Sequence, residues 1–346
     1  MSFNHLIKLN SEQFINIGNN MEIKKIAIIQ EAPVLLNLQE GVLKAARLIR
    51  EAGKAGAELI VFPECWLTGY PAWVFGMAGW DCANARYWYE KFLAQCPTAD
   101  DEILSPIRKA ALESGAHVML GFNEKARVGS GSIFNSTLFI GPNGKTLNVH
   151  RKLILTLTER NVWAQGDASG LNVIDTEIGR IGSLICWEHW HPLARHTLHH
   201  QDEQIHIACW PDVPESHAIA SRHYAFEGRC FVVAAAQYLT TDDIPDELLE
   251  AYKIGANPPD KNSNVLFNGG SGVIGPDGNW IVEQTFGQNK IIYADINLID
   301  TTRFKHDLDI VGHYSRDDIF QLSVDRTKRQ GLLFKDDLQI DRVGNI

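Results

Sequence analysis

The fold depends most on residues 178–190, which read Ile178-Gly179-Arg180-Ile181-Gly182-Ser183-Leu184-Ile185-Cys186-Trp187-Glu188-His189-Trp190. Gly179 favours a turn, and the apolar run at 181–185 predicts a buried strand that ends at Cys186. A thiol at the tip of a strand can face a cleft, and the free backbone N–H groups after it can bind developing negative charge. A lone cysteine after an apolar run is more often a small buried hydrophobe. Cys186 is therefore a candidate nucleophile only if other residues join it.

The composition is that of a globular protein with a large core. The chain has 346 residues, of which 45% are hydrophobic and 21% are charged. No Ser/Pro/Gly-rich or charge-rich linker divides its middle. We therefore expect one large domain at residues 23–325, a flexible N-terminal segment at 1–22 and a C-terminal tail at 326–346.

The charge and the hydropathy pattern exclude several classes of protein. The net charge of −10 argues against a nucleic-acid-binding surface, which usually needs a concentrated basic face. No stretch approaches the roughly 20 consecutive apolar residues of a membrane span, and the polar N-terminus lacks the apolar core of a secretory signal. We expect no nucleic-acid partner, no membrane partner and a cytoplasmic location.

The six cysteines are scattered along the chain, and none of them forms a C-x-x-C pair. Without an export signal, free thiols in a reducing cytosol are expected rather than disulfides. Thiolate chemistry is then available to the protein. The cysteines are Cys65, Cys82, Cys96, Cys186, Cys209 and Cys230.

Hydrophobic periodicity predicts strands and helices in alternation, interrupted by hairpins. The first part has strands at 24–30, 58–62 and 117–122, helices at 38–54, 84–94 and 100–114, and a hairpin at 133–150. After a second hairpin at 172–185, helices at 190–200 and 216–228 alternate with strands at 204–210 and 230–236, before a hairpin around 275–278. This order predicts an α/β fold, a four-layer α-β-β-α sandwich with two sheets face to face and helices outside. The polar, Pro-containing residues 240–264 are expected to form a long surface excursion.

An aromatic-rich loop is predicted at residues 65–81, CWLTGYPAWVFGMAGWD. This loop either fills its own hydrophobic hole or lines an apolar substrate pocket, because such pockets are built from aromatic side chains around a few polar groups. The sequence leaves both interpretations open.

Three predicted strands each end at a chemically useful residue. Glu64 follows the strand at 58–62, Lys152 follows the first hairpin, and Cys186 follows the second. Strands of one sheet that end on the same side bring such residues together. A carboxylate can take the proton of a thiol, and an ammonium favours the thiolate. The trio therefore predicts a cysteine nucleophile with Glu64 as its base, and with Lys152 and the N–H of Trp187 stabilising charge on the attacked group.

Several motifs resemble those of the nitrilase branch of the nitrilase superfamily, also called carbon–nitrogen hydrolases. They occur in the family's order across roughly residues 24–320. The motifs are VFPE at 61–64, HRKL at 150–153, T-x-x-E-R at 156–160, W-x-x-G-D at 163–167, CWEH at 186–189, P-L-A-R at 192–195, V-G-H-Y at 311–314 and S-R-D-D at 315–318. The resemblance implies the four-layer sandwich and a homodimer, often assembled further into spirals.

The resemblance also implies roles for single residues. Glu64 is then the general base, Lys152 the electrostatic catalyst, Cys186 the nucleophile and Glu159 an additional glutamate that orients Lys152 and the attacked group. Each has a structural alternative: Glu64 as a helix cap, Lys152 as a surface cation, and Glu159 with Arg160 as an exposed ion pair.

The family further implies substrate contacts at Tyr70, Trp163 and Trp187, with core packing as the competing account for Trp163. It implies no metal and no cofactor. The chain departs from the family pattern at Leu155, where proline is common, and at Ala168, where glycine is common. Both departures affect the loop that presents Glu159.

The implied reaction is hydrolysis of an organic nitrile to the carboxylic acid and ammonia through a covalent thioimidate and a thioester. If the tetrahedral adduct expels the thiolate instead, an amide is released. Amidases and carbamoylases share the Glu, Lys and Cys, and a cyanide-hydrolysing member is a further alternative. The sequence does not distinguish aliphatic, aromatic and arylacetonitrile substrates.

Two alternatives come from outside this family. His196 and His200 stand one helical turn apart, as zinc ligands often do, although no H-E-x-x-H motif is present. A non-catalytic assembly or binding protein is the other, and it predicts that Cys186→Ala changes no measurable property.

Overall fold

The computed structural model describes residues 23–256 and 263–328. The predicted N-terminal segment at 1–22 and residues 329–346 of the predicted tail lie outside the described residues. The boundaries proposed for the domain at 23–325 therefore stay predictions.

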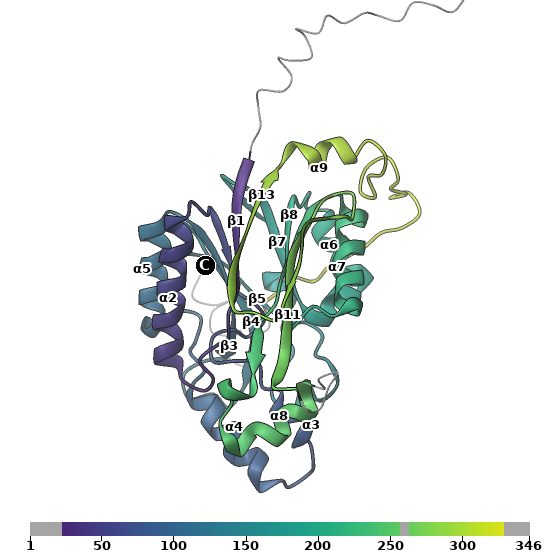
Figure 1. Cartoon of the computed structure of the whole chain (residues 1–346). Coiled ribbons are helices and arrows are strands. Elements are labelled where there is room, and N and C mark those ends of the chain that lie inside the picture. Colours follow the sequence, from purple (N-terminus) through teal and green to yellow (C-terminus); the bar gives the residue numbers. More distant parts are fainter. Residues whose placement is uncertain (1–22, 257–262, 329–346) are drawn as a thin grey trace, which may run out of the picture.

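Two mixed sheets form the centre of the molecule (Figure 1). The first has the order β13-β1-β2-β3-β4-β5, and β1, β2 and β3 run parallel. Its strands are β1 (Ile23–Gln30), β2 (Leu59–Val61), β3 (His117–Lys125), β4 (Ile133–Ile140), β5 (Thr146–Arg151) and β13 (Lys290–Asn297).

The second sheet has the order β10-β11-β9-β8-β7-β6, with β12 paired to β11. In it β7, β8 and β9 run parallel. Its strands are β6 (Ile174–Thr176), β7 (Gly179–Ile185), β8 (Ile205–Cys209), β9 (Phe231–Ala235), β10 (Tyr238–Thr240), β11 (Val265–Ile274) and β12 (Trp280–Phe286).

Side chains alternate across each strand, so each sheet buries both of its faces. In β1, Ala27 and Ile29 pack against the helices α2 (Leu38–Lys54) and α5 (Ser105–Ser114). Ile26 and Ile28 point the other way and pack against the second sheet. The outer face of the second sheet is covered by α6 (Pro192–His199) and α7 (Glu215–Gly228). The predicted four-layer α-β-β-α sandwich is confirmed.

A further hydrophobic cluster closes one end of the sandwich and corrects one prediction. The helices α3 (Trp73–Gly76), α4 (Ala83–Ala94) and α8 (Leu249–Ala256) lie there (Figure 1). Residues 240–264 were expected to be a surface excursion, but Leu248 and Tyr252 are fully buried, and the Tyr252 hydroxyl donates to the Tyr70 carbonyl at 2.8 Å. The acidic residues around them lowered the average hydropathy and concealed the apolar spacing. Residues 257–262 of this segment lie outside the described residues.

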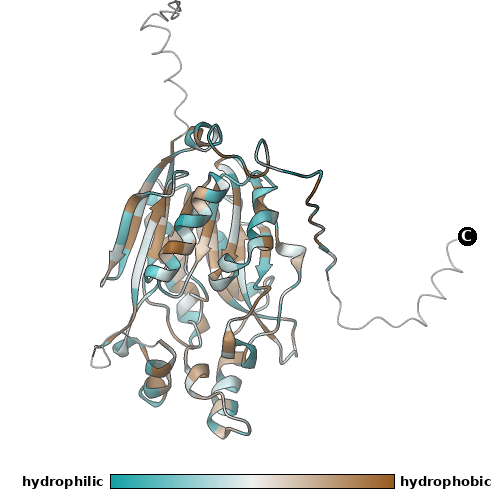
Figure 2. Ribbon diagram, turned by 90° about the vertical axis from the view of Figure 1, so that its right-hand side faces the viewer, coloured by the Kyte–Doolittle hydropathy of each residue, from teal (hydrophilic) through white to brown (hydrophobic). Residues whose placement is uncertain are grey.

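The remaining predicted elements occur near their expected positions, with one change beside Cys186. The helix expected at 190–200 begins at Pro192, and Cys186–Trp190 forms a separate 3₁₀ turn, η4. The last described helix is α9 (Ile299–Phe304). In Figure 2 the helices carry hydrophilic as well as hydrophobic residues, and within the described residues no helix combines the length and apolarity needed to cross a bilayer.

Candidate active site

The two sheets bring the predicted trio into one cluster. Glu64 and Lys152 come from the ends of β2 and β5 in the first sheet, and Cys186 follows β7 in the second. Lys152 Nζ lies 3.1 Å from Glu64 Oε1 and 2.9 Å from Glu159 Oε2. The side-chain oxygen or sulfur atoms of Glu64, Glu159 and Cys186 lie within 4.8 Å of one another. The four predicted catalytic residues are therefore neighbours, although 122 positions separate Glu64 from Cys186 in the sequence (186 minus 64).

The backbone at Cys186 is held in an unusual conformation. Cys186 has φ +54°, in the left-handed region that side chains other than glycine seldom adopt. Such strain persists only where surrounding contacts hold it, and it is common at functional sites. In the turn η4 the backbone N–H of Trp187 opposes the rise in the pKa of the Cys186 thiol, so it favours the thiolate. Cys186 retains 4% of its surface, whereas Glu64 retains none.

Burial dominates the electrostatics of the cluster. It raises the pKa of Glu64 to about 7, with Lys152 opposing the rise and Glu159 adding to it. Burial, followed by the charge of Glu64, raises the pKa of the Cys186 thiol well above its ordinary value. Burial disfavours the Lys152 ammonium, but Cys186, Glu159 and Glu64 outweigh it and raise the Lys152 pKa well above its ordinary value. The resting site thus has a protonated thiol and a permanent cation between carboxylates.

Hydrogen bonds orient Glu64 and leave one of its oxygens available. Asn135 Nδ2 donates to Glu64 Oε1 at 2.7 Å, and Gln237 Nε2 donates to the Glu64 carbonyl at 2.7 Å. Glu64 Oε2 is buried, and the described residues give it no hydrogen-bond partner. A buried carboxylate oxygen without a partner is costly and reactive, as a general base requires.

Glu159 is held from two sides. Its Oε1 accepts from the Tyr70 hydroxyl at 2.8 Å, and its Oε2 accepts from the Thr156 N–H at 2.7 Å. The Glu159 carboxylate therefore keeps its position on Lys152. It is buried and is not the exposed partner of Arg160 that the sequence left open.

The three predicted substrate contacts lie in different surroundings. Tyr70 and Trp163 are buried edge to face at 5.6 Å, and Lys152 Nζ lies 5.8 Å from the Trp163 ring centroid. Both therefore border the catalytic cluster. Trp187 is 47% exposed, and its Nε1 donates to His217 Nε2 at 3.1 Å.

The prediction from sequence missed Asn135, Gln237 and Glu188. Glu188 is fully buried and accepts from the Ile185 N–H at 2.8 Å and the Leu153 N–H at 2.6 Å. Its other contact is His150 Nε2 at 3.0 Å. This carboxylate joins the ends of β5 and β7 and so fixes Lys152 relative to Cys186. Its position inside the CWEH motif was the available signal, but an acid in a polar segment resembles an exposed one.

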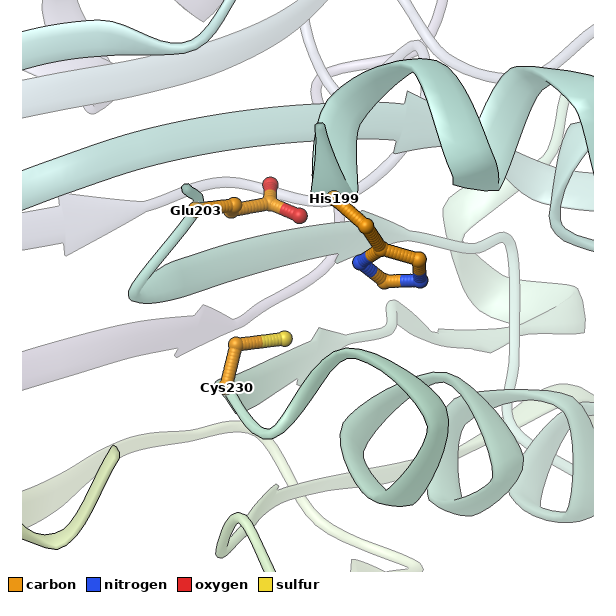
Figure 3. Close-up of side chains that lie close together, drawn as sticks. All are labelled: His199, Glu203 and Cys230. Carbon is orange, nitrogen blue, oxygen red and sulfur yellow. The ribbon is translucent and has the colours of Figure 1, made fainter. Parts of the chain in front are cut away.

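Two clusters of the described residues have the composition of metal sites. One is Glu64, Glu159 and Cys186, where the Lys152 ammonium already pairs with both carboxylates and neutralises one of their two charges. The other is His199, Glu203 and Cys230 (Figure 3). Neither cluster contains His196 or His200, whose rings lie edge to face at 4.6 Å. The zinc alternative based on those two histidines therefore gathers no third ligand among the described residues.

Comparison with known proteins identifies the family. Residues 25–306 match the model of the carbon-nitrogen hydrolase family. The chain is 36% identical to a nitrilase of Bradyrhizobium diazoefficiens over 90% of this chain and 95% of that protein. It is 32% identical to an aliphatic nitrilase of Sinorhizobium fredii, over 89% of this chain and 98% of that protein. A solved carbon-nitrogen hydrolase from Helicobacter pylori G27 has the same fold, with a TM-score of 0.65 at 18% identity, over 87% of this chain and 97% of that one.

The fold and the matched region define the class of the protein, a hydrolase of carbon–nitrogen bonds. The chain belongs to the carbon-nitrogen hydrolase family, and the resemblance to nitrilases inferred from its motifs is confirmed.

Proposed function

We propose that this enzyme is a nitrilase, which hydrolyses an organic nitrile with two waters to the carboxylic acid and ammonia. The names of its relatives support a nitrile substrate. The observation that carries the proposal is the cluster itself: a thiol lies within 4.8 Å of two carboxylates, and one of these has an oxygen without a partner among the described residues. We assign Glu64, Lys152, Glu159 and Cys186 as its catalytic residues.

The first half of the reaction makes a covalent thioimidate. Glu64 Oε2 takes the thiol proton as Cys186 attacks the nitrile carbon, because the thiolate is the nucleophilic form. One π bond of the nitrile breaks, and its electron pair moves to nitrogen, which receives the proton that Glu64 took from the thiol, so Glu64 is again a carboxylate. Lys152 and the Trp187 N–H stabilise the charge that develops there.

The second half releases ammonia and then the acid. Glu64 removes a proton from water, whose oxygen adds to the thioimidate carbon to form a tetrahedral adduct. The adduct breaks its C–N bond, and ammonia leaves after accepting a proton. A second water cleaves the remaining thioester, so the carboxylic acid departs and the thiol is restored. If the adduct breaks its C–S bond instead, an amide leaves, so the hold of Lys152 and Glu159 on the nitrogen sets the ratio of acid to amide.

An amidase or a carbamoylase is an alternative function, because these enzymes share the Glu, Lys and Cys, and a cyanide-hydrolysing enzyme is a further alternative. We propose Tyr70, Trp163 and Trp187 as substrate contacts. Tyr70 and Trp163 place aromatic surface beside Lys152, which suits a nitrile with an apolar substituent. Trp187 contributes the backbone N–H beside the sulfur.

A substrate panel tests the proposed function. Aliphatic, aromatic and arylacetonitriles, cyanide, and the matching amides are incubated with the wild type, with Cys186→Ala and with Cys82→Ala, and ammonia, acid and amide are quantified. We expect ammonia and acid from at least one organic nitrile, loss of turnover by at least about 10⁴-fold in Cys186→Ala, and full activity in Cys82→Ala, since Cys82 is partly exposed at the start of α4. Hydrolysis of amides without release of ammonia from any nitrile would make the enzyme an amidase.

A further inference from the structure

Two buried histidines connect the backbone of Cys186 to the carboxyl group of Glu203, which lies just before β8 in the chain. His189 Nδ1 lies 2.6 Å from the Cys186 carbonyl oxygen. His189 Nε2 lies 2.9 Å from His206 Nε2, and His206 Nδ1 lies 2.8 Å from Glu203 Oε1. The Tyr224 hydroxyl donates to the other oxygen of Glu203 at 2.6 Å. We call Glu203, His206 and His189 the histidine chain.

The side chains of the histidine chain are buried, and both imidazole rings stack on aromatic rings. His206 is fully buried, while His189 and Glu203 expose 1% and 2% of their surface. The His206 ring stacks on Tyr224 with centroids 3.6 Å apart, and the His189 ring stacks on Trp210 at 4.6 Å. Stacking restricts the rotation of both rings and so keeps their nitrogens on these hydrogen-bond partners.

The direction of every hydrogen bond in the chain follows from its first acceptor. A carbonyl only accepts, so His189 Nδ1 carries a hydrogen and its Nε2, in the neutral ring, accepts from His206 Nε2–H. Burial, with His206 as a further cause, lowers the His189 pKa well below its ordinary value, and burial together with His199 does the same for the His206 pKa. Neutral His206 then accepts at Nδ1, so Glu203 donates and must be a carboxylic acid. Burial raises the Glu203 pKa to about 8, which agrees with that form at neutral pH.

The surroundings of Glu203 are shaped for this acid. A Cβ on Gly182 would lie 2.0 Å from Glu203 Oε1, so glycine at this point of β7 provides the space for the carboxyl group. Both Glu203 oxygens already have hydrogen-bond partners. Glu203 is therefore better explained as a donor to His206 than as a metal ligand of the cluster with His199 and Cys230 in Figure 3.

The hydrogen bond between His189 and the Cys186 carbonyl orients the peptide unit that follows Cys186. The Cys186 carbonyl and the Trp187 N–H belong to one planar peptide unit and point in opposite directions. A hydrogen bond that holds the carbonyl on His189 therefore aims the N–H at the opposite side, where its partial positive charge opposes the rise in the pKa of the Cys186 thiol. Rotation of this peptide, about ψ of Cys186 and φ of Trp187, would remove the donor from the site.

We propose that Glu203, His206 and His189 are positioning residues that lock the Cys186–Trp187 peptide with its N–H toward the sulfur, and that Glu203 serves as a neutral hydrogen-bond donor. The proposal rests on the proposed function for its effect on turnover. Its effect on the thiol can be measured without any nitrile.

Three variants and a control test the proposal. Glu203→Gln keeps a donor toward His206 and an acceptor toward Tyr224, whereas Glu203→Met is of similar length and has neither. His206→Phe keeps the stacked ring but removes both nitrogens. His117→Phe is the control, because His117 is a buried ring stacked on Phe139 at the opposite end of the first sheet. The measurements are kcat and KM on the best nitrile, and the second-order rate of iodoacetamide alkylation at Cys186, located by peptide mass spectrometry.

We expect Glu203→Met and His206→Phe to lower kcat and the alkylation rate by roughly 10- to 100-fold with little change in KM, since a displaced catalytic group costs this much. Glu203→Gln should stay within about threefold of wild type, and His117→Phe should match wild type in both rates.

The proposal is overturned if Glu203→Gln is as slow as Glu203→Met, which would make the charged carboxylate the required form. It is also overturned if folded His206→Phe alkylates and turns over at the wild-type rate. If the wild type hydrolyses no nitrile while Glu203→Met still slows alkylation and Glu203→Gln does not, the proposed function fails and the positioning role stands.

Discussion

At the proposed catalytic centre one ammonium lies between two carboxylates and beside a thiol, all of them buried. Lys152 has a hydrogen bond to each carboxylate, so it neutralises one negative charge and leaves the second group sensitive to protonation. Glu64 is that second group, because burial raises its pKa to about 7. Its Oε2, which has no hydrogen-bond partner among the described residues, then exchanges a proton near neutrality, which suits alternating roles as base and acid.

This pKa predicts how activity depends on pH. The base form of Glu64 is the carboxylate, so kcat/KM should fall about tenfold per pH unit as pH drops below about 7. Glu64→Gln should lose activity by at least about 10³-fold at every pH, because no base remains. Rates measured from about pH 5 to 9 on a fixed nitrile check both statements. A wild-type profile that is flat across the acid side would contradict the assignment of Glu64 as the base.

The same shift predicts an opposite effect on stability. The folded-state pKa of Glu64 is raised above its ordinary value of 4.5, so its contribution is fully present below pH 4.5 and is lost as pH rises through about 7. Glu64→Gln has no proton to lose, and its free energy of unfolding relative to wild type should increase across this interval. Urea unfolding of both proteins at several pH values measures the difference, and a difference that is independent of pH would refute it.

At the scale of elements, the residues of the proposed site lie at the ends of strands. A small residue, Gly121, allows the loop of Glu64 to pack closely against β3. Pro63 and Cys65, which bracket Glu64, cross close to β3 at Gly121, and the Leu67 N–H donates to the Gly121 carbonyl at 3.0 Å. Glu188 then joins the ends of β5 and β7 across the two sheets. The positions of Glu64 and Lys152 therefore depend on how whole strands pack and not on their own loops alone.

Gly121→Ala should displace the Glu64 loop. A Cβ at this position would lie 2.0 Å from the Pro63 carbonyl oxygen and 2.8 Å from the Cys65 nitrogen, both backbone atoms that cannot rotate away. We expect a loss of about 1–3 kcal/mol in the free energy of unfolding and a clear fall in kcat. Gly131→Ala is the matched control, because a Cβ there meets no atom within 4 Å. Chemical denaturation and steady-state kinetics of both variants measure the effects, and a Gly121→Ala protein equal to Gly131→Ala would contradict this account.

For the whole molecule, the second helical layer has an exposed apolar surface. Leu193 on α6 and Ile219 and Phe226 on α7 each leave about half of their side chain uncovered, at 53%, 51% and 48%. The helices α6 and α7 lie side by side in Figure 1. Exposed apolar residues gathered on neighbouring elements are typical of protein interfaces, which supports the expected homodimer or larger assembly.

We therefore expect the wild type to elute as a dimer or larger species, and Leu193→Asp combined with Ile219→Asp to shift it toward the monomer. Leu112→Asp on α5, in the opposite helical layer, is the control, because Leu112 is 57% exposed and equally apolar. Size-exclusion chromatography with light scattering gives the masses. A monomeric wild type, or a Leu112→Asp variant that dissociates instead, would refute the expected interface.

The sequence alone was sufficient to predict the α/β sandwich, the residues at the strand ends and the class of enzyme. Short apolar runs identify the buried strands, and each of the motifs around Glu64, Lys152 and Cys186 spans only a few consecutive residues. Both kinds of signal depend on neighbouring residues, so they can be recognised from the amino-acid sequence without the structure. The same reading failed for Tyr252, whose burial depends on contacts with Tyr70, 182 positions away.

The residues that hold the proposed catalytic side chains in place could be assigned only from the folded structure. Asn135 bonds Glu64 from 71 positions away, and Gln237 does so from 173. Glu188 and Glu203 look like solvent-exposed acids in the sequence, yet both are buried. A buried polar side chain needs a hydrogen-bond partner, and that partner determines what the side chain does. The partner can be identified only from the structure in which the two sheets pack face to face. The identity of the proposed nucleophile is therefore a property of the sequence, and its orientation is a property of the folded core.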